Sequence, residues 1–241
     1  MIPKIIHYCW LSNDPIPAEL QKYMKTWEKH LPDYEFMLWN FDRFPKTKSK
    51  WVSDAFDNKK YAFAADYIRL YALYHYGGIY LDMDVEVLHS FNPFLNLREM
   101  LCMESSGNPE VAAFGVEKHC DWIKICLDKY DNKNFINKDG SFNIEPLPSV
   151  INKILKENGY TYKNITNIDT LKQDKMEIVI LPTEYFSPKS YETGKLNITD
   201  KTISIHHFAG SWLPWYEILE AKIWNFFGLK RHYIMNRIFK S

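Results

Sequence analysis

The sequence predicts an open α/β fold built as a single domain. Its first forty residues follow the order strand, helix, strand, which is how such a sheet begins. A length of 241 residues suits one large α/β domain, and 46% hydrophobic residues supply enough apolar material for a core. No internal repeat or low-complexity linker divides the chain.

The first elements are marked by changes in hydrophobic pattern. A short apolar run over Lys4–Leu11 predicts a buried strand, because polar residues and a proline stop it. Glu19–His30 predict a helix. Tyr34–Trp39 predict a second strand, followed by a polar loop through Lys50.

The most informative segment is Ala62–Leu88. Apolar residues at helical spacing predict a helix that ends at Gly77-Gly78. Ile79–Leu88 then alternate, which predicts a strand with one buried face and one acidic face. The acidic face would carry Tyr80, Asp82, Asp84 and Glu86.

Weaker patterns continue the α/β order along the second half of the chain. Helices are predicted over Asp121–Tyr130 and Pro148–Asn158, and strands over Ile178–Leu181 and Thr202–His206. The C-terminal stretch from Tyr216 is helical, aromatic and basic, which defines a basic amphipathic segment at 216–241 after a domain at 1–215.

Composition narrows the possible partners. Thirty basic residues balance 30 acidic ones, so no global field attracts nucleic acid and we expect none to bind. The four cysteines show no metal-site or disulfide spacing, which indicates reduced thiols of a cytoplasmic protein. No stretch approaches the roughly 18 apolar residues that span a bilayer. The expected location is cytoplasmic, at most peripheral on the inner face of the membrane.

Asp82 and Asp84 are candidate metal ligands. Two residues apart on a strand, their side chains would leave the same face about 7 Å apart. Mg²⁺ and Mn²⁺ prefer oxygen ligands and use only one or two protein carboxylates when phosphate and water complete the shell. The alternative is a solvated strand face with chance acids, and the spacing alone favours that alternative.

Asp66 and Arg69 form a second candidate pair. Their i, i+3 spacing places both on one face of the helix before the acidic strand. Gly77-Gly78 permit a tight turn in which backbone can approach a ligand. From spacing alone a surface ion pair is the better interpretation, and the convergence of this helix with the acidic strand is not predicted.

The whole segment AFAADYIRLYALYHYGGIYLDMDVEVL resembles the signature of glycosyltransferases with a sugar-binding region containing a DxD motif. Asp-x-x-Arg, Gly-Gly-x-Tyr and DxD occur in that order and spacing. The segment is also similar to the catalytic domain of the large clostridial glucosylating toxins. Ile2–Leu11 resemble the family's opening strand and His206–Trp212 its late loop. Two regions depart from the family pattern. Leu101–Val116 show no resemblance to it, and Glu145-Pro146 stands where relatives often have a Gly-Pro pair.

The resemblance implies a GT-A fold, a Rossmann-like mixed sheet flanked by helices, and it assigns a role to each site residue. Trp10 would stack on the base, and backbone near Cys9 would supply hydrogen bonds. Without the resemblance, Trp10 could equally be an aromatic residue of the core. Tyr80 and Asp82 would contact ribose and metal, and Asp84 would be the principal metal ligand. Asp66 and Arg69 would bind hydroxyls of the donor sugar. One histidine, His206 or preferably His207, would close over the diphosphate and metal together with Ser211 and Trp212.

The resemblance also implies a reaction, which is metal-dependent transfer of a hexose with retention of configuration. The donor would be a nucleotide sugar (UDP-galactose or UDP-glucose), the acceptor a glycan or lipid-linked saccharide of surface polysaccharide synthesis, and the ion Mn²⁺ or Mg²⁺. A GDP-mannose-dependent mannosyltransferase and a non-enzymatic carbohydrate-binding protein are the alternatives. No nucleophile is identified, since Glu104 reads better as an acceptor contact or surface acid. The basic tail would either contact a membrane or pack on the domain.

Overall fold

A computed structural model describes residues 1–104, 106–165, 174, 176–210 and 215–226. Its centre is a five-stranded mixed sheet of order β2-β1-β3-β6-β5. β1 (Ile5–Cys9) runs parallel to β2 (Glu35–Trp39) and to β3 (Gly78–Leu81). β6 (Ala113–Val116) is antiparallel to β3 and to β5 (Glu99–Met100). The mixed α/β architecture expected from the sequence is confirmed.

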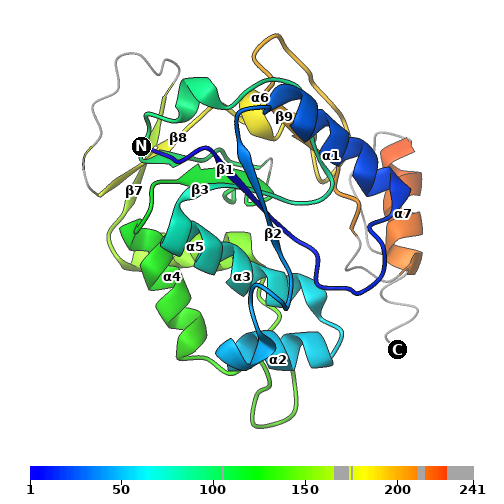
Figure 1. Cartoon of the computed structure of the whole chain (residues 1–241), viewed down its shortest axis with the longest axis vertical. Coiled ribbons are helices and arrows are strands. Elements are labelled where there is room, and N and C mark those ends of the chain that lie inside the picture. Colours follow the sequence, from blue (N-terminus) through cyan, green and yellow to red (C-terminus); the bar gives the residue numbers. More distant parts are fainter. Residues whose placement is uncertain (105, 166–173, 175, 211–214, 227–241) are drawn as a thin grey trace.

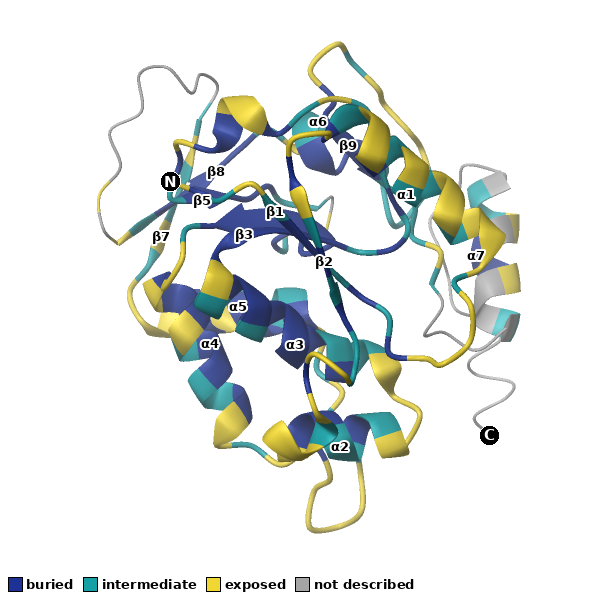
Figure 2. Cartoon of the chain, in the orientation of Figure 1, coloured by how far each residue is buried: buried dark blue, intermediate teal, exposed yellow. Residues whose placement is uncertain are grey.

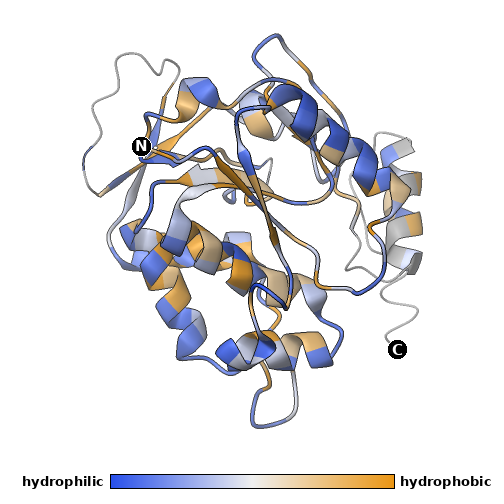
Figure 3. Cartoon of the chain, viewed as in Figure 1, coloured by the Kyte–Doolittle hydropathy of each residue, from blue (hydrophilic) through white to orange (hydrophobic). Residues whose placement is uncertain are grey.

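Helices cover both faces of this sheet (Figure 1). One face is covered by four helices: α2 (Lys50–Asp57), α3 (Tyr61–Tyr76), α4 (Asp121–Asp131) and α5 (Leu147–Glu157). The other is covered by α1 (Ala18–His30) and the short α6 (Thr183–Phe186). Figure 2 shows the central strands buried and the outer faces of the helices exposed, and Figure 3 shows the same division in hydropathy.

The helices enclose two hydrophobic clusters, one on each side of the sheet. Trp39, Trp51 and Trp122 lie in the cluster beneath α2–α5. Trp27 and Phe186 lie in the cluster beneath α1 and α6. Because both faces are covered, β3 is buried at all four residues. The prediction that this strand has one buried face and one acidic face is therefore wrong.

The predicted strand Ile79–Leu88 is in fact two strands in different sheets. β3 ends at Leu81, and β4 (Val85–Val87) pairs antiparallel with β9 (Ser204–His206) in a small separate sheet. A turn joins them, in which the Val85 amide donates to the Asp82 carbonyl at 3.0 Å. The period-2 pattern is continuous across the turn, so the sequence did not reveal the break. The two aspartates consequently lie in a turn and not on a strand face.

Gly77 and Gly78 connect α3 to β3 through backbone that only glycine adopts easily, with φ of 65° and 104°. A Cβ at Gly77 would lie 2.6 Å from the Lys118 amide nitrogen, and one at Gly78 would lie 2.7 Å from the Ile5 carbonyl. The close approach is therefore to other protein backbone and not to a ligand, which corrects the sequence-based interpretation. The buried His7 ring secures the turn by donating from Nε2 to the Gly77 carbonyl at 2.7 Å.

Several elements were missed or shifted. The predicted polar loop through Lys50 contains a 3₁₀ turn at Lys46–Lys48, and α2 begins directly after it with Ser49 as its N-cap. β7 (Thr161–Asn164) was not predicted and pairs in parallel with β8 (Glu177–Ile180). A second 3₁₀ turn occupies Asn92–Phe94.

α7 (Trp215–Phe226) covers the first part of the predicted C-terminal helix. Residues 227–241 lie outside the described residues, so the predicted boundary and the basic tail stay predictions. Among the described residues, no helix has both the length and the apolarity to cross a bilayer.

Candidate active site

Two of the predicted site residues lie at the carboxyl ends of neighbouring parallel strands. Trp10 follows β1, and Asp82 follows β3. β1 is the point where the strand order turns, since β2 lies on one side of it and β3 on the other. In open α/β sheets the crevice at such a switch point is where ligands bind.

Asp82, Asp84 and His206 form a group whose ligand atoms all lie within 4.8 Å of one another. His206 Nε2 is 3.6 Å from Asp84 Oδ2. Two carboxylates with one imidazole suit a divalent ion of the Mn²⁺ type, so these side chains fit the metal implied by the DxD motif. The turn brings them together, although the predicted strand-face geometry is wrong.

Electrostatics at this group favour a cation. Burial raises the pKa of Asp82, Arg69 opposes the rise, and Asp84 adds to it. Burial lowers the pKa of His206, but the negative charges of Glu110 and Asp84 outweigh that effect and bring it to about 9. Negative charge is therefore concentrated here, and a bound cation would relieve the repulsion.

Arg69 joins helix α3 to the acidic turn, which is the turn between β3 and β4 that carries Asp82 and Asp84. Its Nη2 lies 2.8 Å from Asp82 Oδ1 and 3.6 Å from Asp66 Oδ1. Its Nη1 donates to the Val111 carbonyl at 2.7 Å. Because Arg69 is only 5% exposed, the surface-ion-pair interpretation is wrong. Asp66 is also buried, which raises its pKa to about 7.

Tyr80, which lies shortly before the acidic turn, packs against Arg69. The ring of Tyr80 is buried and lies 4.3 Å from the Arg69 guanidinium carbon. Tyr80 also hydrogen-bonds the Cys9 thiol, whose pKa burial raises to about 12. The Tyr80 side chain is thus buried in the core, so only the backbone of Tyr80 could contact ribose. Trp10 is half-buried, and its Nε1 donates to the Asp14 carbonyl at 2.8 Å.

The adjacent histidines point in opposite directions. His206 faces Asp84, whereas His207 Nε2 lies 2.9 Å from Glu86 Oε2. The His207 ring stacks on Tyr23 of α1 with 4.5 Å between centroids. The geometry therefore places His206 in the acidic group and gives no support to the preference for His207.

The late loop meets the acidic turn through backbone. The Ala209 amide donates to Asp84 Oδ2 at 2.7 Å, and the His207 amide donates to the Asp84 carbonyl at 3.1 Å. Ser211 and Trp212 lie outside the described residues, so their predicted roles over the diphosphate stay predictions.

Glu110 is a site residue that sequence reasoning missed. It is fully buried, and both its carboxylate oxygens lie 3.4 Å from His206 Nδ1. Burial tends to raise its pKa, but His206 holds the pKa below the ordinary value. No signal in the sequence pointed to it, because it lies in the individual segment Leu101–Val116.

Glu104 lies in the same segment. Burial raises its pKa to about 7, and the charge of Glu110 adds to the rise. One of its oxygens accepts from the Ser106 hydroxyl at 2.9 Å. The surface-acid interpretation does not describe this environment.

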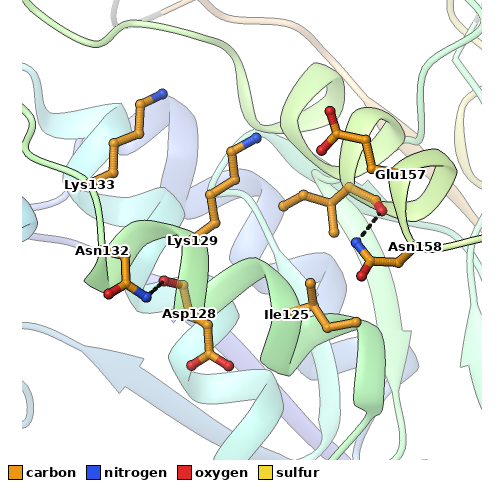
Figure 4. Close-up of a pocket in the computed structure, with 8 residues that line it drawn as sticks. Ile125, Asp128, Lys129, Asn132, Lys133, Glu157 and Asn158 are labelled. Atoms are coloured by element: carbon orange, nitrogen blue, oxygen red, sulfur yellow. Dashed lines mark hydrogen bonds between the residues drawn. The ribbon is translucent and has the colours of Figure 1, made fainter.

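A groove of about 470 Å³ lies elsewhere, between α4 and α5 (Figure 4). Two polar side chains at its edge serve as helix caps, since Asn132 and Asn158 donate to the Asp128 and Ile154 carbonyls. None of its lining residues surrounds the acidic turn. The groove is therefore not the candidate donor site.

Comparison with known families agrees with the residue-based interpretation. Residues 17–101 match the family described as "Glycosyltransferase sugar-binding region containing DXD motif". The match lies within the first half of the chain. The matched region contains Asp66, Arg69, Asp82 and Asp84, and the resemblance seen in the sequence is confirmed there.

Two curated relatives are similar to part of this chain. Inositol phosphoceramide mannosyltransferase 3 of Schizosaccharomyces pombe is 38% identical over 99 residues, covering 39% of this chain and 28% of that protein. Mannosyl phosphorylinositol ceramide synthase SUR1 of Saccharomyces cerevisiae is 38% identical over 144 residues, covering 56% of this chain and 37% of that protein. The chain therefore spans well under half the length of these relatives.

A solved structure supports the fold. The PaToxG glycosyltransferase superposes with a TM-score of 0.52 at 20% identity, covering 65% of this chain and 69% of that one. The GT-A fold that the sequence resemblance implied is confirmed.

Proposed function

We propose that this chain transfers a hexose from a nucleoside diphosphate sugar to a saccharide or lipid-linked acceptor in a metal-dependent, retaining reaction. The observation that supports it most directly is the convergence of Asp82, Asp84 and His206 at the switch point of a GT-A sheet. The ion pair between the buried Arg69 and the part-buried Asp82 fixes that group relative to α3.

In this proposal each side chain has one task. Asp82, Asp84 and His206 would hold the ion, and Arg69 fixes the orientation of Asp82. The ion, when bound, supplies Lewis-acid stabilisation of negative charge on the departing nucleoside diphosphate. Asp66 and Arg69 lie beside Asp82 and would hold hydroxyls of the donor sugar. Retention of configuration rests on the family resemblance.

Two donors are candidates. The opening strand with Trp10 supports a UDP-hexose, as the sequence resemblance implied. The names of the two yeast relatives favour mannose instead, and GDP-mannose is the corresponding alternative. The same names support a lipid acceptor bearing phosphoinositol, whereas a role in surface polysaccharide synthesis at the inner face of the membrane rests on the resemblance alone.

Donor hydrolysis distinguishes these possibilities. The purified chain with Mn²⁺ is offered UDP-galactose, UDP-glucose, UDP-N-acetylglucosamine and GDP-mannose, and released UDP or GDP is measured. We expect one of the four donors to be hydrolysed much faster than the others. A carbohydrate-binding protein without activity would release neither.

Asp84→Asn tests the metal in the same assay. The amide keeps the shape of the side chain but loses its charge, so we expect at least about a hundredfold loss of turnover. Asp200→Asn, an exposed aspartate in a turn, is the matched control and should keep full activity. Unchanged turnover of Asp84→Asn, with EDTA present, would refute metal dependence.

A further inference from the structure

The buried Glu110 has contacts that the proposed reaction does not explain by itself. Its residue is 0% exposed, although a glutamate is rarely buried in this way. Oε1 accepts from the Ala112 amide at 2.8 Å, and Oε2 accepts from the Ser187 hydroxyl at 2.8 Å. These two donors fix the plane of the Glu110 carboxylate. Both of its oxygens also face His206 Nδ1.

His206 is therefore held between two carboxylates. Nδ1 lies 3.4 Å from both oxygens of Glu110, and Nε2 lies 3.6 Å from Asp84 Oδ2. Glu110 accepts only, so the nitrogen facing it must carry a proton. Nε2 is then the nitrogen that can present a lone pair to the acidic turn. A metal-binding histidine commonly has its second nitrogen bonded to a carboxylate in this way.

The same short segment positions the rest of the group. The Val111 carbonyl accepts from Arg69 Nη1 at 2.7 Å. The Ala112 carbonyl accepts from the Asp82 amide at 2.8 Å. Three consecutive residues thus contact His206, Arg69 and Asp82, and Glu110 is the one whose side chain does so.

We propose that Glu110 is a positioning residue that orients His206, with Nδ1 protonated and Nε2 directed at Asp82 and Asp84, and so strengthens binding of a divalent cation. This inference rests on the proposed metal-dependent function. It assigns a task to a residue outside the region that matches the glycosyltransferase family.

The second histidine supplies a matched control. His207 also contacts a carboxylate, Glu86, at 2.9 Å, but its ring stacks on Tyr23 and is not part of the acidic group. Glu110→Gln and Glu86→Gln therefore make the same chemical change beside adjacent histidines. Only the first should alter the cation site.

Mn²⁺ binding, followed by electron paramagnetic resonance of free Mn²⁺, measures the effect without an activity assay. We expect Glu110→Gln to weaken Mn²⁺ binding by ten- to a hundredfold, and Glu86→Gln to leave it within about twofold. In a His206→Ala background, Glu110→Gln should cause no further loss, because its effect passes through that ring. Wild-type affinity in Glu110→Gln, or an equal loss with and without His206, overturns the proposal.

A second measurement covers the case in which Glu110→Gln does not fold. Ring ¹⁵N NMR of the wild-type chain loaded with diamagnetic Cd²⁺, with His206 assigned by comparison with His206→Gln, reports its tautomer directly. We expect the proton on Nδ1, whereas a proton on Nε2 would contradict the proposal. If the wild-type chain binds neither Mn²⁺ nor Cd²⁺, the proposed metal-dependent function fails instead.

Discussion

The two sides of the candidate site are built in different ways. On one side, α3 and the acidic turn come from one continuous segment, and Arg69 reaches Asp82 across 13 residues. On the other side, His206 meets Glu110 across 96 residues. The first side is visible as a motif in the sequence, whereas the second exists only in the folded chain.

The sides also differ in what their contacts support. Arg69 contacts α3, the acidic turn and the Val111 backbone, so it connects the site to the core. His206 lies at the edge of the small β4-β9 sheet and contacts the carboxylates of Glu110 and Asp84. We therefore expect loss of Arg69 to affect folding, and loss of His206 to affect mainly the cation.

Replacing Arg69 should have the largest effect. Arg69→Met removes one partner of a buried ion pair and leaves Asp66 and Asp82 uncompensated, which typically costs about 3–5 kcal/mol. Urea denaturation measures the free energy of unfolding. Arg43→Met, at an exposed arginine, is the control and should cost well under 1 kcal/mol. A loss of that small size for Arg69→Met would show that the pair does not connect the site to the core.

His7 makes the first side sensitive to acid. Burial lowers the pKa of His7 to about 4 from an ordinary value near 6.5, so the folded state binds fewer protons than the unfolded state between these values. Its contribution is present above pH 6.5 and lost as pH falls toward 4, by at most about 3 kcal/mol. Unfolding in urea at pH 7, 5.5 and 4.5 should show this loss. His7→Asn should show a shallower dependence, and an equal slope would disprove the role of His7.

The adjacent histidines sharpen the comparison on the second side. His206→Ala removes a nitrogen from the acidic group, so we expect Mn²⁺ binding and turnover to fall at least about tenfold. His207→Ala loses a ring stack and a contact with Glu86, which should lower stability by about 1 kcal/mol and leave Mn²⁺ binding intact. Isothermal titration with Mn²⁺ and thermal melting separate the two effects. The opposite ranking would restore His207 as the candidate ligand.

The smallest expected effect concerns the basic tail, which extends beyond α7. A chain that ends at Phe226 loses Lys230, Arg231, Arg237 and Lys240 but keeps α7. If the tail contacts membranes, removing it should reduce flotation with anionic liposomes and leave transfer to a soluble acceptor unchanged. Equal flotation of both chains would mean that the tail contributes no membrane contact.

The sequence determined the parts of the molecule that depend on local pattern. The strand-helix-strand opening, α3 with its glycine end, and the DxD residues all follow from periodicity or from a continuous motif. α2 was missed because its short amphipathic run follows lysines that read as a polar loop. β7 was missed because its pattern of exposed and half-buried residues lacks the apolar run of a central strand.

Only the tertiary structure decided how the site is assembled. A period of two continues through Ile79–Leu88, yet the chain turns at Asp82 because β4 finds its partner in β9, more than a hundred residues later. The same pairing directs His206 toward the acidic turn and His207 toward α1. Burial of Arg69 and Glu110 is likewise set by distant elements that cover them. Hydrophobic periodicity records which local face is apolar, but the partner that covers that face is chosen by packing across the whole chain.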